Sequence, residues 1–156
     1  MTPPTAFPIE SVLTSMRSAF LASNRLSAVL GAQLGVNSTE LSALGHVAQE
    51  PGLTPKHLSE LLGITTGSTT GTADRLAKAG FLLREPHPQD RRSVLLKLTP
   101  AGVHAVQWVF EQYGAALTAA IARRADLSPE DIAGFFQALA ESLEAAASEP
   151  VEASQS

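Results

Sequence analysis

Two neighbouring segments carry side chains suited to contact with a polyanion. Residues 66–71 read Thr-Gly-Ser-Thr-Thr-Gly, and residues 89–93 read Gln-Asp-Arg-Arg-Ser. In the second segment, the Asp90 carboxylate can hold one guanidinium while the other enters a narrow, electronegative groove of duplex DNA. A charged loop exposed to solvent is the simpler explanation of the triplet Asp90-Arg91-Arg92 taken alone. The predicted strands on either side of the triplet and the helix before them favour contact with DNA instead.

The charge distribution supports a nucleic-acid partner although the chain is acidic overall. The 156 residues carry a net charge of −4. From Thr54 to Leu98, however, seven basic and four acidic residues give +3, which leaves −7 for the remainder. A basic lobe on an acidic body attracts DNA where it would dock and repels it elsewhere. An ordinary pattern of solvated charges explains these numbers about equally well.

The elements around these segments are two short helices and a hairpin. Thr54 and Pro55 are typical of a helix start, Gly63 predicts a turn, and Thr65 predicts the start of a second helix that stops at Gly80. Residues 81–84 and 93–98 have β-like patterns, and Pro86 and Pro88 keep the loop between them irregular. This order predicts a winged helix-turn-helix: one helix in a groove and a basic β-loop alongside.

The predicted recognition helix has an unusual outer face. Thr69, Thr72, Ala73 and Leu76 are spaced to pack on the preceding helix, which leaves hydroxyls and glycines outward. That outward set lacks the long polar side chains that form bidentate contacts with bases, although small residues allow close approach. The residues that we expect to contact DNA are Lys56, Thr66, Gly67, Ser68, Thr70, Gly71, Arg75, Arg84, Arg91 and Arg92, with Asp90 orienting the wing.

Helices flank this lobe on both sides. Residues 9–34 have helical apolar spacing, Asn37 and Glu40 resemble a capping box, and Glu50, Pro51 and Gly52 end the helix that the box begins. A long helix follows Thr99 and Pro100, and Ser128 and Pro129 begin the last one. We therefore predict a mainly α fold with a small β-hairpin wing.

Three stretches together resemble the MarR family of winged helix-turn-helix regulators: LTPKHLSELLGI, ADRLAKAGF and QDRRSVLLKLTPAG. The resemblance covers roughly residues 38–102, and the wing signature corresponds to Asp90, Arg92, Leu98, Thr99 and Gly102. Two features depart from the family pattern. Ser59 replaces a frequent Ala, and the recognition helix lacks long polar side chains, which puts base-specific readout in doubt.

The resemblance implies an obligate homodimer with interlocked terminal helices. The chain then divides into a flexible arm (1–8), an N-terminal dimerisation helix (9–36), the DNA-binding lobe (37–99), C-terminal dimerisation helices (100–147) and a disordered tail (148–156). It also implies a transcriptional regulator, a repressor in our interpretation, that binds a pseudo-palindromic operator of double-stranded DNA. Many members bind small aromatic or phenolic effectors, for which Phe20, Trp108 and Tyr113 are our candidates. Partial burial as packing residues is the alternative for Trp108 and Tyr113.

Two other classes stay open: an architectural DNA-binding protein with weak sequence preference, and an interaction module that binds no DNA. An enzyme is disfavoured, because the sequence contains no nucleophile elbow, phosphate loop or dinucleotide fingerprint. The four histidines are scattered singly, so we expect no metal site and no cofactor, although a zinc-sensing relative is conceivable. With no cysteine and no apolar run of bilayer length, we expect a cytoplasmic protein.

Overall fold

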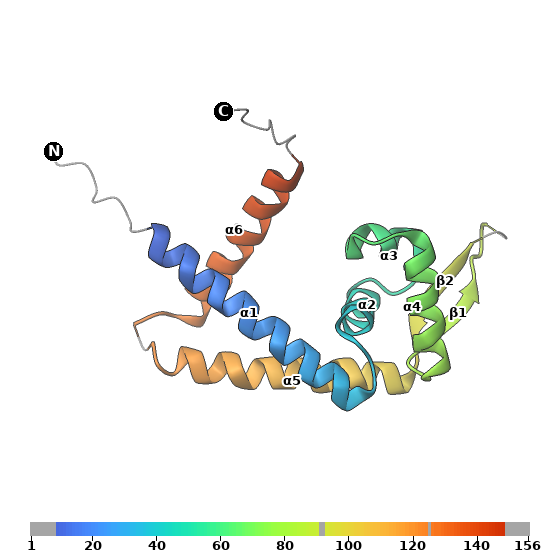
Figure 1. The fold of residues 1–156 in the computed structure, drawn as a ribbon, viewed down its shortest axis with the longest axis horizontal. Coiled ribbons are helices and arrows are strands. Elements are labelled where there is room, and N and C mark those ends of the chain that lie inside the picture. Colours follow the sequence, from blue (N-terminus) through green and yellow to red (C-terminus); the bar gives the residue numbers. More distant parts are fainter. Residues whose placement is uncertain (1–8, 91–92, 125, 149–156) are drawn as a thin grey trace. The chain divides into compact units, whose positions relative to one another are not determined.

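The computed structural model describes residues 9–90, 93–124 and 126–148. The chain forms two compact units, residues 1–110 and 111–156, which are considered separately. Within the described residues there are six helices and one β-hairpin, as the sequence predicted (Figure 1). Their order is α1 (Ile9–Leu34), α2 (Ser38–Gln49), α3 (Pro55–Leu62), α4 (Thr66–Lys78), β1 (Leu82–Pro86), β2 (Val94–Leu98), α5 (Pro100–Ile121) and α6 (Pro129–Ser148). The boundary between the compact units falls within α5, and the functional division given above stays a prediction.

The helix starts of the lobe are set by the side chains that the sequence indicated. Asn37 and Glu40 form a complete capping box at α2, since each side chain accepts the other's backbone N–H at 2.9 Å. Thr54 and Thr65 cap α3 and α4 by accepting backbone N–H groups three residues ahead. Gly63 has a φ of 63°, which permits the sharp turn between α3 and α4.

One apolar core joins α2, α3, α4 and the hairpin. Its largest fully buried side chains include Leu44, Leu58, Leu76 and Leu96, one from each of these elements. On α4 the buried residues are Thr69, Thr72, Ala73 and Leu76, the inward face predicted from spacing. Because this face is fixed against the core, the opposite face of α4 is presented outward.

The hairpin is antiparallel, and Leu82 pairs with Leu98 at its base. The first strand was predicted to end at Arg84 but continues to Pro86, which faces Val94. Pro86 is tolerated because in a two-stranded sheet its missing N–H can face away from the ladder. The predicted Phe81 and Ser93 fall just outside the strands. Leu53, before α3, adds a short β-bridge to Leu96 that the sequence did not predict.

In the second unit, α6 has no buried residue. Phe135 and Phe136 are 59% and 56% exposed and touch edge to face, with ring centroids 5.9 Å apart. Ser128 caps the helix as predicted, accepting the N–H of Asp131 at 3.0 Å. Among the described residues, the apolar stripe of α6 is therefore left largely exposed.

The junction between the wing and α5 is a tight approach of two backbones. The Thr99 hydroxyl donates to the Gly80 carbonyl at 2.6 Å and accepts the Gly102 N–H at 3.0 Å, which caps α5. A Cβ at Gly102 would lie 2.2 Å from the Phe81 carbonyl oxygen. Gly102 is thus required by the close packing of the two backbones, and Thr99 supplies the hydrogen bonds that join them.

Gly102→Ala should therefore destabilise the protein by about 1–3 kcal/mol, because backbone has to move to admit one methyl group. Gly45→Ala is the matched control: Gly45 lies within α2, and no described atom comes within 4 Å of a Cβ built there. That control should be neutral or up to about 1 kcal/mol stabilising through helix propensity. Urea unfolding of both variants tests this, and equal stabilities would contradict the close approach.

Candidate nucleic-acid interface

The outer face of α4 is small and polar, as predicted. Thr66, Gly67, Ser68 and Thr70 are exposed, and Gly71 is half-buried. The Thr65 hydroxyl donates to the Ser68 hydroxyl at 3.0 Å, which leaves the Ser68 proton directed elsewhere. The Thr70 hydroxyl donates to the Thr66 carbonyl at 2.9 Å, so outward it can only accept. The face can therefore both donate and accept single hydrogen bonds.

Gly67 has no packing reason to be glycine among the described residues. No described atom lies within 4 Å of a Cβ built there. Glycine within a helix costs roughly 1 kcal/mol relative to alanine. Its φ is not in the left-handed region, so the backbone does not require glycine either. The described residues therefore give neither a packing reason nor a backbone reason for glycine at this position.

Arg75 is anchored to α2 by a buried carboxylate. Its Nε donates to Glu40 Oε1 at 2.5 Å, and its Nη2 donates to Thr72 Oγ1 at 3.3 Å. Glu40 is only 5% exposed, whereas the Arg75 side chain is 60% exposed. The other Glu40 oxygen accepts the Asn37 N–H. The sequence assigned Glu40 a capping role only, and its bond to a residue 35 positions later was not predicted.

The pKa of Glu40 reflects this arrangement. Burial by itself raises the pKa of the carboxyl group, but hydrogen bonds from Arg75 and the Asn37 N–H, with the Arg75 charge, outweigh burial. The net result is a pKa below the ordinary value. Glu40 is therefore ionised at neutral pH, and its charge pair with Arg75 is intact.

Arg84 is also held within the lobe. Its Nη1 lies 2.9 Å from Asp74 Oδ1, and its Nη2 donates to the Thr70 carbonyl at 3.2 Å. These contacts join β1 to α4. Of the other predicted DNA contacts, Lys56 is exposed on α3, while Arg91 and Arg92 lie outside the described residues.

The described part of the wing tip is organised by His87. Its Nδ1 accepts the backbone N–H groups of Gln89 and Asp90 at 3.2 and 3.1 Å. The His87 N–H donates to the Ser93 carbonyl at 3.1 Å, and the Ser93 N–H donates to the Asp90 carbonyl at 3.0 Å. The geometry assigns the ring proton to Nε2. Sequence reasoning treated His87 only as a lone histidine; its place just before a tight turn was the available signal.

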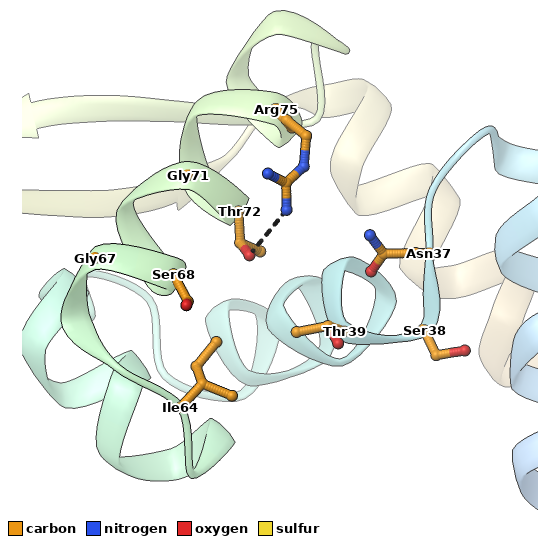
Figure 2. A pocket seen from close by; sticks show the side chains of 9 residues that line it. All are labelled: Asn37, Ser38, Thr39, Ile64, Gly67, Ser68, Gly71, Thr72 and Arg75. Carbon is orange, nitrogen blue, oxygen red and sulfur yellow. Dashed lines mark hydrogen bonds between the residues drawn. The ribbon is translucent and has the colours of Figure 1, made fainter.

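A groove runs between the start of α2 and the outer side of α4 (Figure 2). It has a volume of about 750 Å³. Its lining brings together four predicted contact residues, Gly67, Ser68, Gly71 and Arg75, with Asn37, Ser38, Thr39, Ile64 and Thr72. Most of these contribute hydroxyls, amides or bare backbone. The groove therefore offers a bound molecule hydrogen-bonding groups as well as apolar surface.

A second groove, of about 440 Å³, is mainly apolar. It is lined by Val47, Ala48, Pro51, Lys97, Leu98, Val103, Val106, Gln107 and Phe110. Of the three effector candidates, Phe20 is 50% exposed on α1, and Trp108 and Tyr113 are half-buried on α5. None of these three residues belongs to the lining of this groove.

Within the described ranges, no group of His, Asp and Glu side chains is placed to hold a metal ion. None of the helices in those ranges is long and apolar enough to cross a bilayer.

Comparison with known proteins identifies the lobe as a winged helix-turn-helix. The sequence model of the MarR family matches residues 34–93. The multiple antibiotic resistance protein MarR of Salmonella typhimurium is 36% identical over 69 residues, which are 44% of this chain and 48% of the relative. The uncharacterized HTH-type transcriptional regulator YcgE of Bacillus subtilis is 38% identical over 63 residues, which are 40% and 41% of the two chains. The chain thus spans about half the length of these relatives.

Solved structures extend the likeness beyond the lobe. RV1404 from Mycobacterium tuberculosis has a TM-score of 0.68 at 23% identity, over 95% of this chain and all of that one. The transcriptional regulator Tm0710 from Thermotoga maritima has a TM-score of 0.64 at 25% identity, covering 92% and 99% of the two chains. Residues 34–93 therefore match the MarR family, and the chain shares the fold of these solved structures.

Glu40→Gln should lower the free energy of unfolding by about 1–3 kcal/mol at pH 7, because a charged hydrogen bond to Arg75 is lost while the cap remains. The folded-state pKa of Glu40 lies below its unfolded value of about 4.3. Its contribution is therefore complete above pH about 5 and is lost as the pH falls through the folded pKa. Urea titrations from pH 7 to pH 2.5 measure this.

The control for that series is Glu60→Gln, since the Glu60 side chain is 58% exposed and its near neighbour is His57 at 3.3 Å. It should change stability by less than about 0.5 kcal/mol. A Glu40→Gln deficit that stayed constant through the acid range would show that the charge of Glu40 is not its source.

Proposed function

We propose that this protein is a homodimeric DNA-binding repressor that a small effector releases from its operator. The observation that carries the proposal is the outer face of α4, where Gly67 and its neighbours offer hydroxyls and bare backbone. The face is held outward by a core on its opposite side. Such a face allows a helix to sit deep in the major groove and form single hydrogen bonds with phosphates and base edges.

A second copy of the chain is the proposed cover for the exposed apolar stripes. Phe135, Phe136 and Leu143 of α6 are 59%, 56% and 47% exposed, and Phe20 of α1 is 50% exposed. Apolar side chains of this size, gathered on helices, favour association. A symmetric dimer would carry two winged lobes and would bind a pseudo-palindrome with half-sites about one helical turn apart.

The proposed release follows from linkage. An effector that binds more tightly when the two lobes are wrongly spaced for DNA lowers operator affinity, and the operator lowers effector affinity equally. An effector with an aromatic or otherwise apolar body matches the groove lined by Val47, Val103 and Phe110, among others. A ligand that held α5 against α2 there could alter the position of a lobe.

Selection from randomised duplexes tests the proposal. It should return a pseudo-palindrome with soft preferences at the half-site centres, since the outer face of α4 makes few bidentate base contacts. Arg91 or Arg92 in the minor groove should add A·T-rich flanks. Binding to all duplexes alike would indicate the architectural alternative, and binding to none would indicate the interaction module. Several invariant G·C pairs in each centre would contradict shape-based readout.

On the selected duplex, Arg92→Ala should weaken binding by about 1–3 kcal/mol, the usual value of one groove or phosphate contact. Arg84→Ala should cost less, because the Arg84 guanidinium is bonded to Asp74 and the Thr70 carbonyl. A gel-shift titration of the two variants, both checked for folding by circular dichroism, measures this. Wild-type affinity for Arg92→Ala would refute the role of the wing.

A further inference from the structure

Arg75 lies where it can supply the long polar side chain that the outer face of α4 otherwise lacks. It lies one and two turns beyond Gly71 and Gly67, on the same side of the helix. Its Nη1 would lie 3.4 Å from a Cβ at Gly71, so the guanidinium extends back over that glycine. In Figure 2 its side chain borders the groove and bonds to Thr72. The guanidinium therefore reaches the side of α4 that adjoins α2.

The donors of Arg75 are divided between the protein and the groove. Nε is bonded to Glu40, and one Nη2 proton is directed to Thr72. A guanidinium has five N–H donors, so both Nη1 protons and one on Nη2 are left without a partner among the described residues. An unrestrained arginine loses rotamer entropy when a ligand fixes it. The bonds to Glu40 and Thr72 already restrain the Arg75 side chain, so less of that entropy remains to be lost.

We propose that Glu40 is a positioning residue for DNA binding: it holds Arg75 so that the Nη groups meet a backbone phosphate beside α4. The proposal rests on the proposed function. A phosphate is favoured over a base because Arg75 faces the α2 side of the helix, where the groove is lined by Ser38 and Thr39. When the start of a recognition helix contacts base edges in the major groove, the sides of the helix face the phosphate backbones that border that groove.

The charge of Glu40 makes the proposal testable. Positioning of Arg75 and simple charge repulsion predict opposite changes in DNA affinity when that charge is removed. Removing a carboxylate near a polyanion strengthens binding if only net charge matters. If Glu40 positions Arg75, Glu40→Gln weakens binding although it adds one unit of positive charge per protomer. Glutamine suits the same capping position, so the α2 start should remain.

The experiment measures affinity for the selected duplex and for a scrambled duplex by fluorescence anisotropy at several salt concentrations, using the full-length protein. Arg75→Ala should weaken binding to both duplexes by roughly 5- to 100-fold. It should also reduce the salt slope by about one per protomer. Glu40→Gln should weaken both at least about twofold, and this loss should disappear in the Arg75→Ala background. Glu60→Gln, the charge-matched control, should bind as well as or better than wild type.

Arg75→Lys provides a second variant in which the capping box is untouched. Lysine keeps the charge but cannot bond to Glu40 along one edge and DNA along another, so affinity should again fall several-fold. Tighter binding by Glu40→Gln, or wild-type affinity for Arg75→Lys, would overturn the proposal. A loss confined to the selected duplex would also overturn it, since it would indicate a base contact. If the wild-type protein bound neither duplex, the proposed function itself would be wrong. That outcome differs from the variant results, which test only the positioning role of Glu40.

Discussion

The buried carboxylate of Glu40 is the interaction on which the geometry of the candidate interface depends. A charged group removed from water has to find donors, and Glu40 finds one on each wall of the groove: the Asn37 N–H and the Arg75 guanidinium. Breaking such a pair from one side leaves a desolvated charge, which is more costly than the pair is stabilising. The start of α2 and the third turn of α4 are thereby held at a fixed separation, as a groove for a rigid duplex strand requires.

The wing is fixed by backbone contacts rather than by charge. Leu53 bonds to Leu96 from outside the hairpin, with the Leu96 N–H donating to the Leu53 carbonyl at 2.8 Å. At the other end of β2, Thr99 and Gly102 clamp the chain against the residues that follow α4. The hairpin is therefore fixed at its base relative to α4. Because its base is fixed, the hairpin keeps its orientation relative to α4. A DNA contact at the tip of the wing would therefore keep its place relative to the outer face of α4.

Most of the fold could be predicted because its signals are local. Caps, turn glycines and apolar periodicity involve residues within four positions of one another, so Asn37, Thr65 and Gly63 could each be assigned from their neighbours. The outer face of α4 followed from the same periodicity. The pairs Glu40–Arg75, Arg84–Asp74 and Leu53–Leu96 could not be predicted, since each joins elements whose relative placement is decided by the core.

The ion pairs also reduce the long-range attraction for DNA that the +3 charge of residues 54–98 suggests. Arg75, Arg84 and Lys97 are paired with Glu40, Asp74 and Glu85. Among the described residues, no carboxylate lies within 4.0 Å of the ammonium groups of Lys56 or Lys78, which are exposed.

A paired cation keeps its neighbouring anion when DNA arrives, so it adds less to the long-range potential than a lone cation does. Its value lies instead in geometry, because the side chain is already ordered. The described part of the lobe thus combines weak attraction with fixed donors. That combination favours selectivity for the shape of a bound strand over affinity for any polyanion.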